Sequence, residues 1–272
     1  MRHAPIGIFD SGYGGLTVFK HIRELMPEYE YIYLGDNARN PYGTRSFDVV
    51  YHYTLEAVEK LFSLGCELVI LACNTASAKA LRTIQQKDLP RIAPNKRVLG
   101  VILPSVEEVG AIQSQHVGIL GTVGTINSHS YSIEIKKLFP DIKVTEEACP
   151  MWVPLVENRE YDKPGADYFI RQHVEAILRR SPDIDTLVLG CTHYPLLLDK
   201  IKSYVPQGIT ILSQGALVAK KLKLYLNNHP EMEVRCRLGA NALFYTTESS
   251  ERFKSSAEIF LDDSITVEHI EI

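Results

Sequence analysis

Two short apolar stretches, residues 68–72 and 186–190, each end at a cysteine that is followed by further hydrogen-bonding side chains. The first leads into Cys73-Asn74-Thr75 and the second into Cys191-Thr192-His193. Short apolar runs of this kind are typical of strands buried on both faces of a parallel sheet. Helical patterns between the apolar runs would cover such a sheet. The sequence therefore predicts an α/β fold.

The pattern occurs twice along the chain. Residues 6–10 lead into a glycine-rich turn, Ser11-Gly12-Tyr13-Gly14-Gly15, and residues 117–121 lead into Thr122-Val123-Gly124-Thr125. Each turn precedes its cysteine by a similar number of residues. We therefore expect two similar parallel-sheet α/β domains related by a pseudo-twofold axis, with the active site in the cleft between them. We expect residues 1–97 plus 210–272 to form the first domain and residues 98–209 to form the second.

Individual elements follow from local patterns. We expect linkers at residues 90–96 and 205–208, which contain prolines, and a polar C-terminal stretch after the last predicted helix. The expected strands are residues 5–9, 29–34, 68–72, 117–121 and 186–190, and the expected helices are residues 16–25, 47–64, 75–86 and 216–227.

Composition excludes several classes of protein. The 272 residues carry a formal net charge of -4, with no basic face to predict nucleic-acid binding. The apolar runs are too short to span a membrane, and no signal peptide is evident, so we expect a cytoplasmic protein. Five widely spaced cysteines, without a CxxC pair, argue against a disulfide framework or a zinc site. Neither glycine-rich turn matches a nucleotide-binding loop.

The two strand-end cysteines have a physical reason to be reactive. A thiol at the start of a helix is stabilised as thiolate by the helix dipole and by free backbone N–H groups. If the two domains face each other, Cys73 and Cys191 approach one ligand from opposite sides. One thiolate could then remove a proton from a carbon centre while the other thiol returns a proton to the opposite face. A cysteine hydrolase or a small-molecule-binding module is the alternative on this fold.

Several blocks together resemble the glutamate racemases of the aspartate/glutamate racemase superfamily over essentially the whole chain. Any one of these blocks alone would be weak, but the cysteine blocks at their spacing are specific. The blocks are Asp10-Ser11-Gly12-x-Gly14-Gly15-Leu16, Gly35-Asp36, Pro41-Tyr42-Gly43-x-Arg45, Cys73-Asn74-Thr75-Ala76-Ser77, Gly121-Thr122-x-Gly124-Thr125, Ala148-Cys149-Pro150 through Leu155-Val156-Glu157, and Gly190-Cys191-Thr192-His193-Tyr194-Pro195.

The resemblance implies roles for individual residues. Cys73 and Cys191 would be the two acid/base groups, with Asp10 assisting the first and His193 the second. Glu157 would tune the second site, the alternative being a solvated surface glutamate. For Cys149 we expect only a packing role. The implied substrate-binding residues are Asp10, Ser11, Tyr42, Gly43, Asn74, Thr75, Thr192 and His193.

The resemblance also implies a substrate and a setting. The substrate would be glutamate, converted without metal or other cofactor by a homodimer that supplies D-glutamate for peptidoglycan. Aspartate or another acidic amino acid is the alternative substrate. One departure stands out, because Ser213-Gln214 occupies the place where the family often has an Asp-Ser pair. A family subset has an N-terminal extension that helps bind an activator, and we expect no such regulation here.

Overall fold

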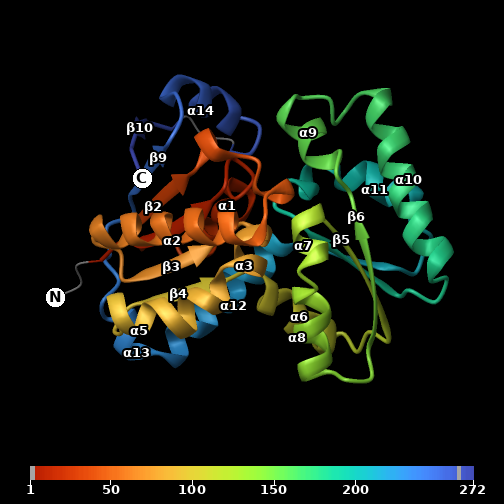
Figure 1. Cartoon of the computed structure of the whole chain (residues 1–272), viewed down its shortest axis with the longest axis horizontal. Helices are drawn as coiled ribbons and strands as arrows, with labels where there is room; N and C mark the ends of the chain where they lie inside the picture. Colours follow the sequence, from red (N-terminus) through yellow and green to blue (C-terminus); the bar gives the residue numbers. More distant parts are fainter. Residues whose placement is uncertain (1–3, 262–264) are drawn as a thin grey trace.

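The computed structural model describes residues 4–261 and 265–272, which form two parallel β-sheets side by side (Figure 1). The first sheet has six strands in the order β10-β9-β2-β1-β3-β4, and the second has four in the order β6-β5-β7-β8. Every pairing within both sheets is parallel, which confirms the expected fold class.

The central strands of the first sheet are buried because the side chains on both of their faces are apolar. In β1, Ile6 and Ile8 pack into one hydrophobic cluster, whereas Phe9 packs into another on the opposite face. This alternation follows the two-residue period of a strand. The strands are β1 (Ile6–Asp10), β2 (Tyr31–Gly35), β3 (Leu68–Leu71), β4 (Arg97–Gly100), β9 (Ala242–Thr246) and β10 (Val267–His269).

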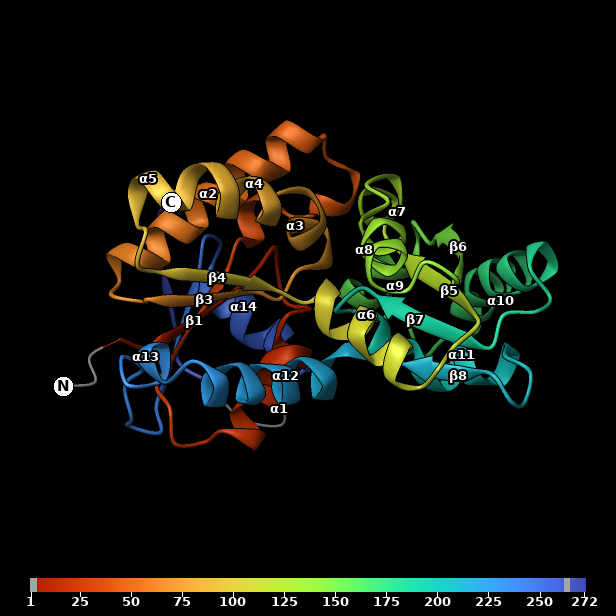
Figure 2. The same ribbon diagram turned by 90° about the horizontal axis from the view of Figure 1, so that it is seen from below.

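Helices from distant parts of the chain cover the two faces (Figure 2). Helix α1 packs against α12 on one face, while α2 and the short segments that follow β3 lie on the other. The helical elements of this domain are α1 (Leu16–Leu25), α2 (Phe47–Ser63), α3 (Asn74–Lys79), α4 (Leu81–Thr83), a π-helical turn (Ile84–Asp88), α5 (Leu89–Ile92), α12 (Gln214–Asn228), α13 (Pro230–Glu233) and α14 (Ser250–Ala257), with 3₁₀ turns η1 (Asn37–Arg39) and η2 (Tyr42–Thr44).

The second sheet has the same layered plan. Helices α6, α7 and α8 cover one face, and α9, α10 and α11 contribute to the core on the other. Its strands are β5 (His116–Gly121), β6 (Lys143–Ala148), β7 (Thr186–Gly190) and β8 (Thr210–Leu212). Its helices are α6 (Ile102–Ala111), α7 (Val123–Asn127), α8 (Ser130–Leu138), α9 (Trp152–Glu157), α10 (Pro164–Arg180), the 3₁₀ turn η4 (Tyr194–Leu197) and α11 (Leu198–Tyr204).

The two sheets share one strand order. Reading β2-β1-β3-β4 against β6-β5-β7-β8 matches β1 with β5 and β3 with β7. Cys73 therefore follows β3 and Cys191 follows β7 at corresponding places, as duplication of one unit predicts. The pseudo-twofold axis itself stays a prediction.

The chain crosses between the sheets twice. It leaves the first sheet after β4, at Gly100, and returns after β8, at Leu212. Strand pairing therefore places residues 98–100 with the first sheet and residues 210–212 with the second, whereas the division of the chain into domains stays a prediction.

One local expectation was wrong. The stretch expected as a linker at residues 90–96 begins inside helix α5, because Pro90 occupies its first turn, where proline is tolerated. The polar C-terminal stretch contributes β9, α14 and β10, and β9 pairs with β2. No helix within residues 4–261 and 265–272 is both long and apolar enough to cross a membrane.

Candidate active site

A cavity of about 100 Å³ lies between the two domains, at the carboxyl ends of their strands. Ligands bind in this position in open parallel sheets. Both cysteines singled out from the sequence line it. The lining residues are Ser11, Asn40, Pro41, Tyr42, Gly43, Thr44, Cys73, Asn74, Thr75, Thr122, Val123, Cys149, Pro150, Val153, Pro154, Glu157, Cys191, Thr192 and His193.

Cys73 caps the N-terminus of α3. Its sulfur atom accepts a hydrogen bond from the backbone N–H of Ala76 at 3.4 Å and lies 3.5 Å from the Ser11 hydroxyl oxygen. Burial and the neighbouring Asp10 carboxylate raise the pKa of Cys73 to about 12, outweighing both hydrogen bonds. Cys73 is therefore a neutral thiol near neutral pH.

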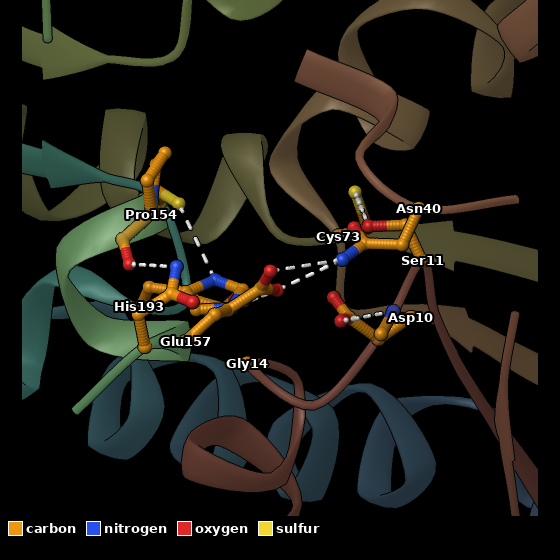
Figure 3. A network of polar contacts seen from close by, with 12 residues as sticks. Asp10, Ser11, Gly14, Asn40, Cys73, Pro154, Glu157 and His193 are labelled. Carbon is orange, nitrogen blue, oxygen red and sulfur yellow. Dashed lines mark hydrogen bonds and ion pairs between the residues drawn. The ribbon is translucent and has the colours of Figure 1, made fainter. Parts of the chain in front are cut away.

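Asp10 ends β1 and is almost fully buried, but it does not line the cavity. One carboxyl oxygen accepts a hydrogen bond from the backbone N–H of Gly12 at 2.9 Å. The other, Oδ2, is buried without a hydrogen-bond partner among the described residues (Figure 3). Burial raises the pKa of Asp10, against the lowering effect of His193. Asp10 can therefore influence Cys73 by its charge and exchange a proton more readily than an ordinary aspartate.

On the other side of the cavity, Cys191, His193 and Glu157 form a chain of contacts. Figure 3 shows His193 and Glu157 next to each other. The Cys191 sulfur lies 3.8 Å from Nδ1 of His193, and Nε2 of His193 lies 3.1 Å from Oε1 of Glu157. Burial alone would lower the pKa of His193, but the contacts with Cys191 and Glu157 outweigh it and raise the pKa to about 10. The same contact lowers the pKa of Glu157 despite its burial. His193 is therefore an imidazolium cation beside the Cys191 sulfur.

Asn40 is a contact residue that the sequence reasoning missed. Its Nδ2 atom donates to both carboxylate oxygens of Glu157, at 2.9 and 3.1 Å, across the boundary between the two domains (Figure 3). Asn40 precedes Pro41 in a loop, and nothing in a single sequence distinguishes it from an ordinary turn residue.

Tyr42 and Gly43, which we expected to bind substrate, line the cavity from the η2 turn. The Tyr42 hydroxyl is not turned toward the thiols, because it donates to the buried Asp36 carboxylate. Arg39 and the Thr247 hydroxyl also bond to Asp36 and fix its position. Tyr42 therefore presents its ring and backbone to the cavity.

Hydroxyl groups form another part of the wall. The Thr75 and Thr122 hydroxyl oxygens lie 2.9 Å apart, and that of Thr125 lies 3.0 Å from Thr122. Asn74 also lines the cavity, and so does Thr192, whose backbone carbonyl accepts from the Thr17 hydroxyl at 2.9 Å. These groups give the cavity several hydrogen-bond donors for an anionic ligand.

Cys149, for which we expected only packing, also lines the cavity. Burial raises the pKa of its thiol well above the ordinary value, and the sulfur lies 3.8 Å from the Glu147 carbonyl oxygen. A neutral thiol in this position fits a packing role. Within the part of the chain that the structure describes, no three His, Cys, Asp or Glu side chains are arranged to hold a metal ion.

The two sides of the cavity thus differ in charge. An imidazolium cation stabilises negative charge on the Cys191 sulfur, whereas Cys73 keeps its proton. Negative charge on Cys191 would also help to raise the pKa of Cys73, after the larger effects of burial and Asp10. A base and an acid on opposite walls of one cavity can move a proton on and off a carbon atom held between them.

Comparison with known proteins places these features in context. Residues 15–222 match the family model described as Asp/Glu/Hydantoin racemase. The chain is 38% identical to a glutamate racemase from Ruegeria sp. (strain TM1040), over 97% of this chain and 98% of the relative. It is 37% identical to a glutamate racemase from Streptococcus uberis over the full length of both.

Solved structures agree with the sequence relatives. The glutamate racemase isoform RacE1 from Bacillus anthracis superimposes with a TM-score of 0.90 at 34% identity, covering 100% of this chain and 99% of the other. A glutamate racemase from Francisella tularensis, solved with D-glutamate, gives a TM-score of 0.89 at 29% identity, with 100% and 98% covered.

Proposed function

Because the chain belongs to the Asp/Glu/hydantoin racemase family, a family of isomerases, we propose that it interconverts L- and D-glutamate through two thiols. The observation that carries the proposal is the placement of Cys73 and Cys191. They follow corresponding strands of two similar sheets and line one cavity from its two sides.

The proposed reaction is a transfer of protons. The Cys191 thiolate takes the α-proton of L-glutamate, and the Cys73 thiol gives a proton to the opposite face of the resulting carbanion. D-glutamate leaves with Cys191 protonated and Cys73 deprotonated, which is the state that deprotonates D-glutamate in the reverse direction. Before the next L-glutamate reacts, the Cys191 thiol gives its proton to solvent and the Cys73 thiolate takes one up. This restores the starting state, so no atom is gained or lost over the cycle and no cofactor is consumed.

The neighbours of each thiol suit it to its task. His193, held as a cation by Glu157, stabilises the Cys191 thiolate. Asp10 has a raised pKa, and its Oδ2 atom has no hydrogen-bond partner among the described residues, so it can assist proton transfer at Cys73. Ser11, Asn74, Thr75 and Thr192 offer donors to the substrate carboxylates, and the turn at Tyr42 and Gly43 closes the cavity around them.

The wider role follows from the substrate. We propose that the enzyme supplies D-glutamate for peptidoglycan synthesis, acts in the cytoplasm as a homodimer and needs no metal or organic cofactor. Light scattering coupled to size-exclusion chromatography would test the dimer, because a monomer at micromolar concentration contradicts it.

A racemisation assay on a panel of pure enantiomers tests the substrate. The circular dichroism signal should decay to zero whether the reaction starts from L- or from D-glutamate, because each reaction ends with equal amounts of the two enantiomers. Aspartate, alanine and glutamine should react at least tenfold more slowly. Faster turnover of aspartate, or no turnover of glutamate by folded protein, refutes the substrate assignment.

The Cys191–His193–Glu157 contacts favour a second candidate, a cysteine hydrolase with Cys191 as nucleophile. The two functions differ in their need for Cys73. A hydrolase retains activity on ester or amide substrates in the Cys73→Ser variant, whereas a two-thiol racemase loses its activity.

A further inference from the structure

Gln214 lies at the start of α12, where the chain returns from the second sheet to the first, and its side chain is buried. It belongs to the Ser213-Gln214 pair that departs from the family pattern. The side chain lies within hydrogen-bonding distance of Asn74, Tyr131 and Ser105 and of the Val101 carbonyl. Those three partner side chains are also buried.

Gln214 and Asn74 form a reciprocal pair of amides. Nδ2 of Asn74 donates to Oε1 of Gln214 at 2.5 Å, and Nε2 of Gln214 donates to Oδ1 of Asn74 at 3.1 Å. The Tyr131 hydroxyl donates to Oδ1 of Asn74 at 2.8 Å and lies 2.7 Å from Nε2 of Gln214. Rotating the Asn74 amide by half a turn would place nitrogen against nitrogen and oxygen against oxygen.

The backbone carbonyl of Val101 fixes the orientation of the two amides. The Val101 carbonyl can only accept a hydrogen bond, and it lies 3.1 Å from Nε2 of Gln214. The amide nitrogen of Gln214 must therefore face Val101, which leaves its oxygen for Asn74. The position of the Val101 carbonyl therefore determines, through Gln214, which way the Asn74 amide faces.

Asn74 lines the cavity directly after Cys73. Its Nδ2 atom has two hydrogens, and Gln214 accepts one of them. We infer that Gln214 is a positioning residue that locks the Asn74 amide so that the second Nδ2 hydrogen serves as a donor to a substrate carboxylate beside Cys73. This inference rests on the proposed function.

Gln214→Met tests it, since methionine has the same length and cannot make the amide pair. Its KM for both glutamate enantiomers should rise about ten- to hundredfold, the size of one lost hydrogen bond to a charged group, with a smaller change in kcat. Ser105→Ala is the matched control. It removes another partner of Gln214 without touching Asn74, so it should lower Tm and leave KM within about twofold.

A double-mutant cycle separates positioning from a general loss of structure. Asn74→Ala should also raise KM, and adding Gln214→Met to that variant should raise KM no further. Effects of the two substitutions that multiply, or an unchanged KM in Gln214→Met with a lowered Tm, overturn the inference. If Gln214→Met does not fold, Tyr131→Phe takes its place. Removing that hydroxyl should raise KM severalfold, and an unchanged KM again overturns the inference.

The experiments distinguish a failure of the proposed function from a failure of the role proposed for Gln214. If the unmodified protein does not racemise glutamate, the substrate assignment is wrong. If it does, but Gln214→Met keeps the parent KM, only the role of Gln214 is wrong.

Discussion

Glu157→Gln should make racemisation sensitive to alkaline pH. The Glu157 carboxylate contacts the buried His193, whose pKa is raised from 6.5 to about 10 by Cys191 and Glu157 together. Glutamine keeps the size of the side chain and its contact with Asn40 but removes the charge. A group with a raised pKa stays protonated below that pKa and loses its proton as pH rises through it. Lowering the pKa therefore brings the loss of the imidazolium to a lower pH.

The structure sets the expected size of the effect. Burial lowers the pKa of His193 and the contacts with Cys191 and Glu157 raise it, so removing the Glu157 charge lowers this pKa below about 10. Each tenfold weakening of proton binding corresponds to about 1.4 kcal/mol. At pH 7 His193 is almost fully protonated in the parent. At pH 9.5 about three quarters of the parent molecules keep the imidazolium, and a tenfold weakening of proton binding in the variant would leave it in about one quarter, a roughly threefold loss.

The measurement is the initial rate of L-glutamate racemisation, followed by circular dichroism from pH 7 to pH 10. Any loss caused by a changed orientation of His193 is the same at every pH, so the extra loss at high pH isolates the charge. Glu160→Gln is the matched control, because it removes a carboxylate that is half-exposed and paired with Lys163. If the pH profile of Glu157→Gln runs parallel to that of the parent, Glu157 does not hold His193 in its charged form.

Three further predictions concern the same cavity. Cys73→Ser and Cys191→Ser should each lower racemisation by about 10²–10⁴-fold, since a hydroxyl is a far weaker acid than a thiol, and a near-parental rate in either variant contradicts the two-thiol reaction. Activity should survive dialysis against a chelator and treatment with a carbonyl reagent; loss that only added metal or pyridoxal phosphate reverses would show a cofactor. Gly14→Ala should destabilise the fold by about 1–3 kcal/mol and lower activity, because its Cβ would lie 2.4 Å from Nδ1 of His193. Gly12→Ala, whose Cβ meets nothing closer than 3.4 Å, should keep its Tm, and equal effects of the two substitutions would contradict this account.

The sequence predicted those parts of the fold whose pattern is local. Strands β1, β3 and β7 are continuous apolar runs, and α1 and α2 have clear helical spacing, so their positions were correct to within a residue or two. Strands β9 and β10 were missed because they are short edge elements of the first sheet, and only their pairing with distant strands stabilises them.

Some residues of the site could likewise be predicted from the sequence, and others could not. The residues at strand ends, such as Cys73 and Cys191, follow from the rule that ligands bind beyond the carboxyl ends of parallel strands, and the structure places both around one cavity. Asn40 and Gln214 were not predicted as site residues, because their importance lies in partners more than a hundred residues away. The direction of the Tyr42 hydroxyl, toward Asp36, also depends on three-dimensional packing.

The return of the chain to the first sheet sets an order for synthesis on the ribosome. Tyr31 pairs with Ala242, so the edge of β2 remains without its β9 neighbour until about 200 further residues have been translated. The second sheet is contiguous in the chain and can close as soon as β8 has emerged. We expect the second domain to resist protease first on stalled nascent chains, with the first domain and the shared cavity completed only after β9 has emerged. Protease resistance of the first domain in chains stalled before residue 240 would contradict this order.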